Sequence, residues 1–267
     1  MGKKRADVVL YEKGLAESRE KAKRFIMEGA VYIGNRRIDK PGEKISVDAP
    51  IEIKKNPLPY VSRGGLKLEK AIKSFNIDFK DKVAMDIGAS TGGFTDCMLQ
   101  HGAKKVYALD VGYGQLDWKL REDSRVIVKE RTNIRYVTKE DIEDVFDFIT
   151  IDVSFISLKL VLPVAKELLS DSGYIVALIK PQFEAGPEKV GKKGIVRDKE
   201  IHIEVIKAIK QFCNSIDLNI IDLDYSPITG STGNIEFLSY ISKDTYKKSI
   251  DDEYIINIVD KAHKFLK

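Results

Sequence analysis

Charged side chains beside four apolar runs are the residues of this 267-residue chain that could do chemistry. Asp110 and Asp152 each close an apolar run, Lys180 follows another, and Glu236 begins the last one. An acid in the position of Asp110 can accept both hydroxyls of a ribose, and a lysine behind an apolar run is partly desolvated. Single charges of this kind are usually caps or solvent-facing. Several at one sheet edge, a lysine among them, indicate a functional site.

A glycine-rich turn precedes these residues and indicates the kind of ligand. In residues 83–95 an apolar strand ends at an acid, and a glycine turn then leads into a helix, as in the ligand-binding turns of parallel sheets. The spacing is G-x-x-x-G-G and not the G-x-G-x-x-G of dinucleotide-binding folds. We therefore expect a nucleoside cofactor, S-adenosylmethionine; the alternative is a strand–turn–helix joint without a ligand. The expected cofactor contacts are Asp86, Gly88, Ala89, Ser90, Gly92, Gly93, Phe94, Asp110, Val111 and Asn133.

The elements that must position these residues alternate between strand and helix from residue 82 onward. Expected strands cover residues 83–87, 106–111, 126–129, 146–153, 174–179, 220–225 and 236–242. Expected helices cover residues 63–75, 94–101, 158–169, 200–216 and 253–266. This alternation predicts an α/β, Rossmann-like fold of seven mostly parallel strands with helices on both faces. Ligands bind such sheets at the carboxyl ends of the strands, where the charged residues are expected to meet.

The first 60 residues differ from the rest in charge and pattern. They hold 14 lysines and arginines against 9 aspartates and glutamates, a net charge of +5, which leaves −1 of the total +4 for the remaining chain. A local basic excess suits a polyanion such as nucleic acid; an ordinary solvated surface is the alternative. A capped helix near residues 18–29 and short alternating strands predict a small α+β module over residues 1–55. The proline-containing residues 56–62 are expected to form a linker before a second domain, 63–267.

Several motifs in the first module carry a resemblance to a known family. R-A-D at residues 5–7, S-R at 18–19, F-I-x-x-G-x-V-x-I at 25–33 and G-N at 34–35 resemble the RNA-binding module first seen in a small-subunit ribosomal protein. In that family a helix and a strand loop present basic residues to structured RNA, which is recognised largely by shape and phosphate. The resemblance implies RNA contacts by Arg5, Arg19, Lys23, Arg24, Arg36 and Arg37.

A second resemblance covers most of the chain. Lys67, Asp152, Lys180 and Glu236 stand in the order and contexts of the Lys-Asp-Lys-Glu tetrad of FtsJ-like ribose 2′-O-methyltransferases, and D-I-G-A-S-T-G-G-F-T at residues 86–95 resembles their cofactor loop. With Y-V-S-R-G-G-x-K-L at 60–68, K-P-Q-F-E at 180–184 and G-K-K-G-I-V-R-D at 191–198, the chain is identified as a member of the TlyA, or hemolysin A, family. This resemblance implies a class I methyltransferase domain that methylates cytidine 2′-hydroxyls in ribosomal RNA.

The resemblance to the tetrad implies a role for each of its four residues at the ribose. Lys180 is expected at the 2′-hydroxyl, with Asp152 holding it and also lying near the amino group of the cofactor's methionine portion. Lys67 and Glu236 are expected to position the ribose and set the charge of Lys180. Alignment for in-line displacement is worth roughly 7–11 kcal/mol in favourable cases, and general-base help contributes roughly 10²–10⁴-fold. Whether Lys180 acts as a neutral base or as a cation that stabilises the forming alkoxide stays open.

Other functions are weighed against this interpretation. G-P-E-K-V-G-K at residues 186–192 matches the glycine and lysine spacing of a phosphate-binding loop, but Lys193 stands where Ser or Thr should bind Mg²⁺. An RNA-binding protein with an inactive methyltransferase domain and a membrane-lytic protein are the alternatives. No run approaches the roughly 18 apolar residues of a membrane span, no secretion signal follows the basic start, and the two cysteines and three histidines are too scattered for a metal site. We expect a cytoplasmic protein that needs no metal, with ribosomal RNA or ribosomal subunits as its partner; its oligomeric state is not predicted.

Overall fold

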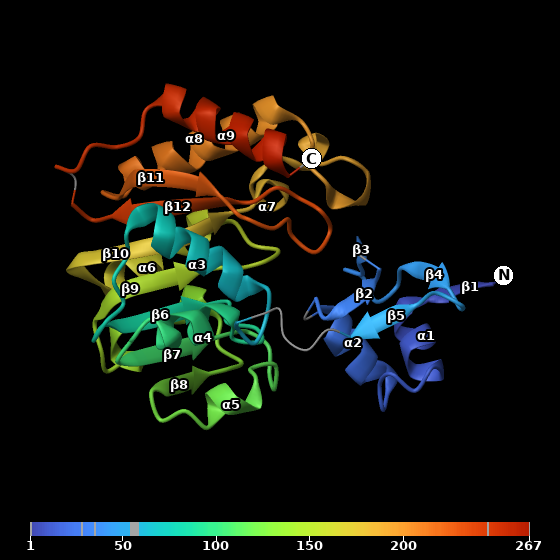
Figure 1. Cartoon of the computed structure of the whole chain (residues 1–267). Helices are drawn as coiled ribbons and strands as arrows, with labels where there is room; N and C mark the ends of the chain where they lie inside the picture. The colour runs from blue at the N-terminus through green and yellow to red at the C-terminus, as the bar shows by residue number, and fades with distance from the viewer. Residues whose placement is uncertain (1, 28, 35, 54–58, 245, 267) are drawn as a thin grey trace. The chain divides into compact units, whose positions relative to one another are not determined.

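The computed structural model describes residues 2–27, 29–34, 36–53, 59–244 and 246–266. The chain divides into two compact units, Met1–Gly65 and Leu66–Lys267 (Figure 1). The two domains predicted from the sequence covered residues 1–55 and 63–267, with a linker between them. Positions 56–58 of that predicted linker lie outside the described residues.

The amino-terminal unit is a small α+β structure, as expected (Figure 1). Strand β1 (Lys3–Arg5) pairs antiparallel with β4 (Lys44–Ser46), and β2 (Val31–Ile33) lies between β3 (Arg36–Arg37) and β5 (Ile51–Ile53). Helices α1 (Ala6–Glu12) and α2 (Arg19–Met27) pack on a shared core. Buried residues of this shared core include Val9, Leu10, Ala22, Ile26, Val31 and Ile38. Helix α1, which begins after Arg5 without a capping side chain, was not predicted from the sequence.

The second unit contains a seven-stranded sheet in the order β11-β12-β10-β9-β6-β7-β8. Its strands are β6 (Val83–Ile87), β7 (Lys105–Leu109), β8 (Val126–Lys129), β9 (Phe146–Ile151), β10 (Leu169–Ile179), β11 (Asn219–Tyr225) and β12 (Phe237–Ser242). The pairs from β8 to β10 are parallel, whereas β12 is antiparallel to both of its neighbours. The mostly parallel, seven-stranded prediction is confirmed.

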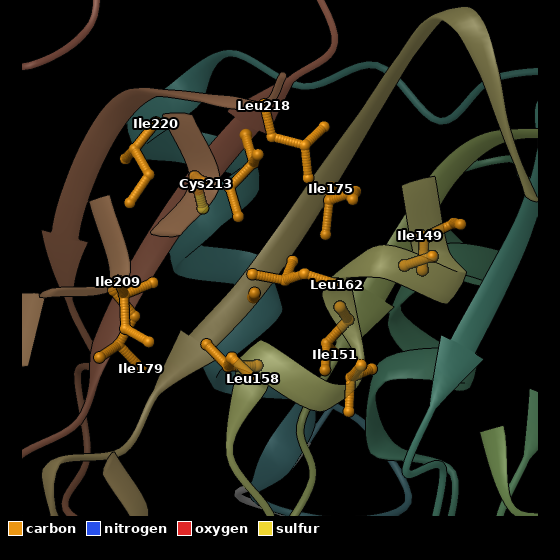
Figure 2. Close-up of a cluster of buried hydrophobic side chains, with 14 of the residues drawn as sticks. Ile149, Ile151, Leu158, Leu162, Ile175, Ile179, Ile209, Cys213, Leu218 and Ile220 are labelled. Atoms are coloured by element: carbon orange, nitrogen blue, oxygen red, sulfur yellow. The ribbon is translucent and has the colours of Figure 1, made fainter. Parts of the chain in front are cut away.

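Helices cover both faces of this sheet (Figure 1). They are α3 (Gly64–Phe75), α4 (Gly93–Gln100), α5 (Trp118–Arg121), α6 (Leu162–Leu168), α7 (Pro181–Glu184), α8 (Lys199–Ser215) and α9 (Asp252–Phe265). Side chains of α6, α8 and α9 bury one face of the sheet (Figure 2). On the other face, Phe75 of α3 stacks on Tyr240 of β12 at 5.3 Å between ring centroids, and Thr95 of α4 contacts Asp86 of β6. Successive strand residues point to opposite faces, so the two sets of helices are separated by the sheet.

Two predicted elements differ from the structure by more than two residues at a boundary. The single helix expected at residues 158–169 is a 3₁₀ turn, Leu158–Leu160, followed by α6, which starts beside Pro163. Strand β10 begins at Leu169, five residues before the predicted start, and has a register shift between Leu169 and Tyr174. Ser170, Asp171, Ser172 and Gly173 lie between the pairing of Leu169 with Phe146 and that of Tyr174 with Phe148, an irregularity of the β-bulge kind that lengthens the strand. Within the described residues, no helix combines the length and the apolarity that crossing a membrane requires.

Candidate active site

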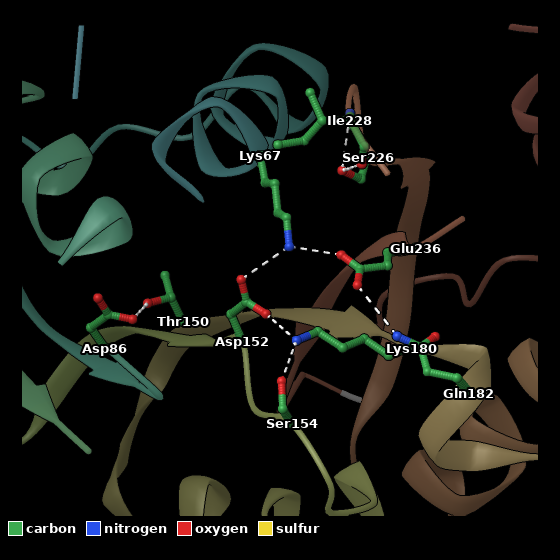
Figure 3. A network of polar contacts seen from close by, with 10 residues as sticks. All are labelled: Lys67, Asp86, Thr150, Asp152, Ser154, Lys180, Gln182, Ser226, Ile228 and Glu236. Carbon is green, nitrogen blue, oxygen red and sulfur yellow. Dashed lines mark hydrogen bonds and ion pairs between the residues drawn. The ribbon is translucent and has the colours of Figure 1, made fainter. Parts of the chain in front are cut away.

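Four charged side chains meet at the carboxyl edge of the parallel strands (Figure 3). The Nζ of Lys67 lies 2.7 Å from Glu236 Oε2 and 3.2 Å from Asp152 Oδ2. The Nζ of Lys180 lies 2.5 Å from the other oxygen of Asp152. The structure therefore brings together all four predicted catalytic residues as one chain of ion pairs, Lys180–Asp152–Lys67–Glu236, which is called the tetrad below.

The strand topology explains why three members of the tetrad reach the same edge. Asp152 directly follows β9 and Lys180 directly follows β10, and these two strands are parallel neighbours. Glu236 directly precedes β12, which runs antiparallel to β10. The start of an antiparallel strand lies at the edge where its parallel neighbours end, so a residue before β12 meets residues after β9 and β10.

Lys67 comes from α3 instead of the sheet, and a second lysine fastens that helix. Lys70 donates from Nζ to Asp224 Oδ1 at 3.0 Å and to the carbonyl oxygen of Tyr225 at 2.6 Å. Ser74 donates to the same Asp224 carboxylate at 2.6 Å. Because residues three or four apart share a helix face, these contacts of Lys70 and Ser74 with β11 hold the turn that carries Lys67.

The tetrad is largely buried and electrically balanced. Lys180 is 7% exposed and Glu236 is 2% exposed. Burial alone would raise the pKa of the Asp152 carboxyl, but the charges of Lys67 and Lys180 outweigh it and hold that pKa below its usual value. Burial alone would lower the pKa of Lys67, but Asp152 and Glu236 outweigh it and raise that pKa. Asp152 is therefore a carboxylate and Lys67 a cation at neutral pH.

Two polar residues that the sequence analysis did not select complete this cluster. Lys180 donates to Ser154 Oγ at 3.2 Å, and Gln182 Nε2 lies 3.5 Å from Glu236 Oε1 (Figure 3). Among the described residues, the buried Oε1 of Gln182 accepts no hydrogen bond. Both lie two residues beyond a predicted catalytic residue, which was the only sequence signal for them.

An exposed aromatic ring stands beside the tetrad. Phe155, three residues after Asp152, is 91% exposed and has a left-handed backbone with φ of 64°. Its ring centroid lies 5.1 Å from that of Phe183, and Phe183 lies 5.9 Å from Lys180 Nζ. Leaving a phenyl ring in water and bending the backbone at a bulky residue are both unfavourable. A planar apolar ligand group is a suitable partner for this pair.

The glycine turn between β6 and α4 needs glycine at two points. Gly88 and Gly92 have φ of 87° and 94°, a region that glycine enters without steric cost. A Cβ on Gly88 would stand 2.7 Å from the carbonyl oxygen of Asp152, and one on Gly92 would stand 2.2 Å from a methyl group of Leu120. The turn therefore packs directly against Asp152 at the end of β9 and against Leu120 of α5. Ala89, Ser90 and Thr91 lie between the two glycines.

Asp110 joins this turn to the next strand. One carboxylate oxygen accepts the Ser90 N–H at 2.8 Å, and the other accepts the Gly112 N–H at 2.7 Å. Each oxygen keeps a further lone pair, so the ribose interaction expected of Asp110 is available. Val111 beside it is 69% exposed, and both residues follow β7 instead of lying in it as predicted.

Two residues predicted to contact the cofactor, Asp86 and Phe94, have buried side chains. Asp86 is 1% exposed and accepts hydrogen bonds from the backbone N–H and the hydroxyl of Thr95. It also accepts one from the hydroxyl of Thr150 (Figure 3). Phe94 is 3% exposed and belongs to the core, while Gly93 begins α4. Both side chains face the interior and shape the turn, and the cofactor contacts expected of Asp86, Gly93 and Phe94 remain predictions.

The buried Asp86 gives a first testable prediction. Burial raises the pKa of this carboxyl to about 7, and hydrogen bonds from Thr95 and Thr150 offset only part of that effect. Between about pH 4 and pH 7 the folded protein then holds a proton that the unfolded chain releases, so stability falls as pH rises, by at most about 4 kcal/mol. The Asp86→Asn variant cannot titrate at this position. Its stability relative to the original protein should rise from pH 4 to pH 7 and level off above about pH 8, as measured by urea unfolding; a difference independent of pH would contradict the assignment.

Asn133 borders a cavity next to the Asp110 region. The cavity has a volume of about 440 Å³ and is lined by Leu109, Lys129, Arg131, Thr132, Asn133, Tyr136, Val137, Asp141 and Ile142. Asn133 Oδ1 accepts the N–H of Arg135 at 3.1 Å, which caps a 3₁₀ turn. The adenine contact expected of Asn133 remains a prediction, with space for a ring beside it.

Most of the predicted RNA-binding residues of the amino-terminal unit form ion pairs with acidic side chains. Arg5 and Arg19 both bind the buried carboxylate of Asp7. Arg36 pairs with Glu43, Arg37 pairs with Asp39, and Lys23 lies 3.5 Å from Glu20. Arg24 is exposed on α2. All six basic side chains remain at the surface of the unit, so a polyanion can reach them.

The glycine and lysine spacing at residues 186–192 does not form a phosphate-binding loop. Residues Pro187–Lys189 form a 3₁₀ turn, and Gly191 pairs with Ile195 in an isolated bridge. A phosphate-binding loop joins a strand directly to the amino end of a helix, whereas α7 separates this segment from β10. Among the described residues, no group of three or more His, Cys, Asp or Glu side chains could hold a metal ion.

Comparison with known proteins gives consistent matches. Residues 60–243 match the model of the FtsJ-like methyltransferases, and residues 4–51 match the S4 domain. The candidate rRNA methyltransferase YqxC of Bacillus subtilis is 56% identical over 99% of this chain and 96% of its own length. The 16S/23S rRNA (cytidine-2′-O)-methyltransferase TlyA of Mycobacterium tuberculosis is 39% identical, over 90% of each chain. The solved structure of a candidate hemolysin from Streptococcus thermophilus is 50% identical, with a TM-score of 0.79 over 99% of this chain and 97% of its own.

Proposed function

Because the chain belongs to the TlyA, or hemolysin A, family of FtsJ-like methyltransferases, we propose that it transfers a methyl group from S-adenosylmethionine to the 2′-hydroxyl of a cytidine in ribosomal RNA. The observation that carries this proposal is the complete tetrad beside the glycine turn. An inactive, purely RNA-binding relative would have no need to keep four buried charges in mutual contact, because burying charges costs several kcal/mol per ion. The S4 domain match supports ribosomal RNA as the class of substrate.

The turn after β6 fits the cofactor. Gly88 and Gly92 bring backbone, without side chains, to the ligand side of the sheet edge, Asp110 retains acceptors for ribose hydroxyls, and Asn133 lines the adjacent cavity. When bound there, S-adenosylmethionine supplies a methyl group that its sulfonium charge already activates. We assign the holding of this cofactor to the backbone of residues 88–92, Asp110, Val111 and Asn133, with Asp152 near its amino group.

The chemical task left to the protein is to align and activate a weak nucleophile, the ribose hydroxyl. As an ammonium group, Lys180 has three N–H donors, of which Asp152 and Ser154 take two and the third is available to the 2′-oxygen, where it would stabilise the forming alkoxide while the proton leaves to solvent. As a neutral amine, Lys180 would instead accept the hydroxyl proton as a general base. Lys67 and Glu236 fix Asp152 from the other side, so Lys180 is oriented before the substrate binds.

Phe155 and Phe183 supply a place for the base of the target nucleotide. Aromatic side chains stack on bases with energies of about 1–3 kcal/mol per base, and single-stranded or extruded nucleotides are the form in which RNA bases are reached. We assign this contact to the exposed ring of Phe155, supported by Phe183. Binding of folded RNA by Arg5, Arg19, Lys23, Arg24, Arg36 and Arg37 would add affinity outside the reaction centre. Since ribosomal RNA is made and used in the cytoplasm of bacteria, we also assign the protein to that compartment.

Methyl transfer to ribosomal RNA is the direct test. The protein is incubated with S-adenosylmethionine labelled in its methyl group and with intact small subunits, intact large subunits or the bare RNA of each. We expect label in at least one RNA, at a cytidine ribose that becomes resistant to alkaline cleavage. Comparing subunits with bare RNA shows whether an assembled particle is required. Bound cofactor without label in any RNA would overturn the proposal and favour an inactive RNA-binding relative.

A further inference from the structure

One buried carboxylate in the amino-terminal unit holds two arginines at once. Asp7 is 0% exposed. Its Oδ1 accepts Nε of Arg5 at 2.9 Å, and its Oδ2 accepts one Nη2 donor from Arg5 at 3.2 Å and one from Arg19 at 3.1 Å. We call Arg5, Asp7 and Arg19 the Asp7 cluster. It joins the end of β1 to the first residue of α2.

Stability alone does not account for this arrangement. Taking a carboxylate out of water costs several kcal/mol, and an apolar replacement of a buried ion pair is often as stable. Arg19 is the first residue of α2, where the helix dipole disfavours a cation. Both features are explained if the two guanidinium groups are held in place for an external anion.

The two arginines keep most of their donors. Each guanidinium has five N–H donors, ten in all, and Asp7 takes three of them, so that seven are left as far as the described residues go. The side chains remain 50% and 47% exposed. Lys23 lies four residues after Arg19, on the same helix face, and extends the cationic surface. Arginine forks match phosphate oxygens in a bidentate manner.

We propose that Asp7 is a positioning residue: it holds Arg5 and Arg19 as a fixed pair that binds one phosphate group of folded RNA. The inference rests on the proposed function for the identity of the ligand. Orienting the guanidinium groups in the free protein removes side-chain entropy that binding would otherwise have to remove. The carboxylate therefore strengthens the binding of an anion, although it carries a charge of the same sign.

Because Asp7 is negatively charged, a net-charge effect and a positioning role predict opposite changes in RNA binding for the Asp7→Asn variant of the full chain. If the basic surface acts only through its net charge, removing one negative charge should tighten RNA binding. If Asp7 positions the arginines, the affinity for RNA should fall by about tenfold. The plot of log affinity against log salt concentration should also become shallower, its negative slope shrinking in magnitude by about one. Both are measured by filter binding to purified small and large ribosomal subunits at several salt concentrations.

Two further variants keep the result interpretable. Asp48→Asn makes the same charge change at an exposed residue of the same unit that forms no ion pair within the described part of the chain; its binding should be equal to or tighter than the original. Arg5→Lys keeps both Asp7 and the net charge but loses the guanidinium fork, and should also weaken binding by about tenfold. If Asp7→Asn fails to fold, which circular dichroism would reveal, Asp7→Glu takes its place: it keeps the net charge but displaces the carboxylate from the two guanidinium groups, and unchanged binding would overturn the role of Asp7.

Steady-state kinetics separate this inference from the proposed function. Asp7→Asn should raise KM for the RNA with kcat and cofactor affinity unchanged, because the reaction centre is untouched. A folded Asp7→Asn variant that binds RNA as tightly as the original protein, or more tightly, would overturn the role of Asp7 while leaving methyl transfer intact. Failure of the proposed function would instead appear as missing methyl transfer by the original protein.

Discussion

Replacing Lys180 with methionine is expected to lower the rate of methyl transfer by about 10²–10⁴-fold while cofactor affinity stays within a few fold. The reason is the position of Nζ, which is held by Asp152 and Ser154 with one donor left for the ribose oxygen. Methionine keeps the apolar stem and removes the only group assigned to the 2′-oxygen. Single-turnover transfer to ribosomal RNA and calorimetric titration with S-adenosylmethionine measure the two quantities separately.

Lys243→Met is the matched control for this variant. Lys243 is also partly buried, and it donates to the carbonyl oxygen of Leu169, at the opposite end of β10 from Lys180. The control should transfer methyl groups at close to the original rate. If Lys180→Met retained transfer within tenfold of the original, the assignment of Lys180 to the ribose hydroxyl would be wrong. Lys180→Arg then distinguishes its two possible roles, since a guanidinium keeps the charge but does not accept a proton at neutral pH.

Asp152→Asn is expected to have the second large effect, on both activity and stability. Asp152 compensates Lys67 and Lys180 together. The amide would leave Lys67 paired with Glu236 alone and Lys180 without a carboxylate partner in the tetrad. Breaking a buried ion pair by removing one partner costs about 3–5 kcal/mol. We expect a loss of that size in urea unfolding, together with loss of methyl transfer because Lys180 is no longer oriented. Asp171→Asn, at a fully exposed carboxylate of the same sheet, should change neither.

The pH dependence of this stability difference follows from the two pKa shifts. Asp152 has a lowered pKa, so its contribution is present above about pH 4 and is lost as pH falls through its folded pKa. Lys67 has a raised pKa, so its contribution is present up to about pH 10 and is lost at higher pH. The stability difference between Asp152→Asn and the original protein should thus shrink as pH falls below about 4 and Asp152 becomes protonated. The charge of Asp152 also raises the pKa of Asp86, which adds a change between about pH 5 and pH 7, so the comparison is made between about pH 8 and pH values below about 4. A difference of the same size at both would show that the ion pairs do not set it.

Local patterns in the sequence were sufficient for the sheet and for most of its edge. Apolar runs that alternate with segments of helical periodicity predict parallel strands. They can be recognised in the sequence because the period and the length of an apolar pattern are local properties of the chain. The residue that ends each run, as Asp152 and Lys180 do, is then placed at the carboxyl edge by topology alone. The order of the tetrad and the glycine turn carried the family resemblance, so the reaction class could be predicted without coordinates.

Tertiary structure decided what depends on contacts between distant segments. Lys67 reaches Glu236 because Lys70 and Ser74 fasten α3 to Asp224, about 150 residues away in sequence. Asp86 looks like a cofactor ligand in the sequence, but packing turns it inward. No pattern distinguishes a carboxylate at a strand end that faces ligand from one that faces the core.

The amino-terminal unit shows the same limit for charges. The sequence alone showed that basic residues are in excess in the first 60 positions and that this part of the chain resembles an RNA-binding module. Only the fold showed that Asp7 is buried and shared by Arg5 and Arg19. Composition records how many charges a chain has, whereas burial and direction, which decide what a charge can do, arise when segments far apart in sequence pack together.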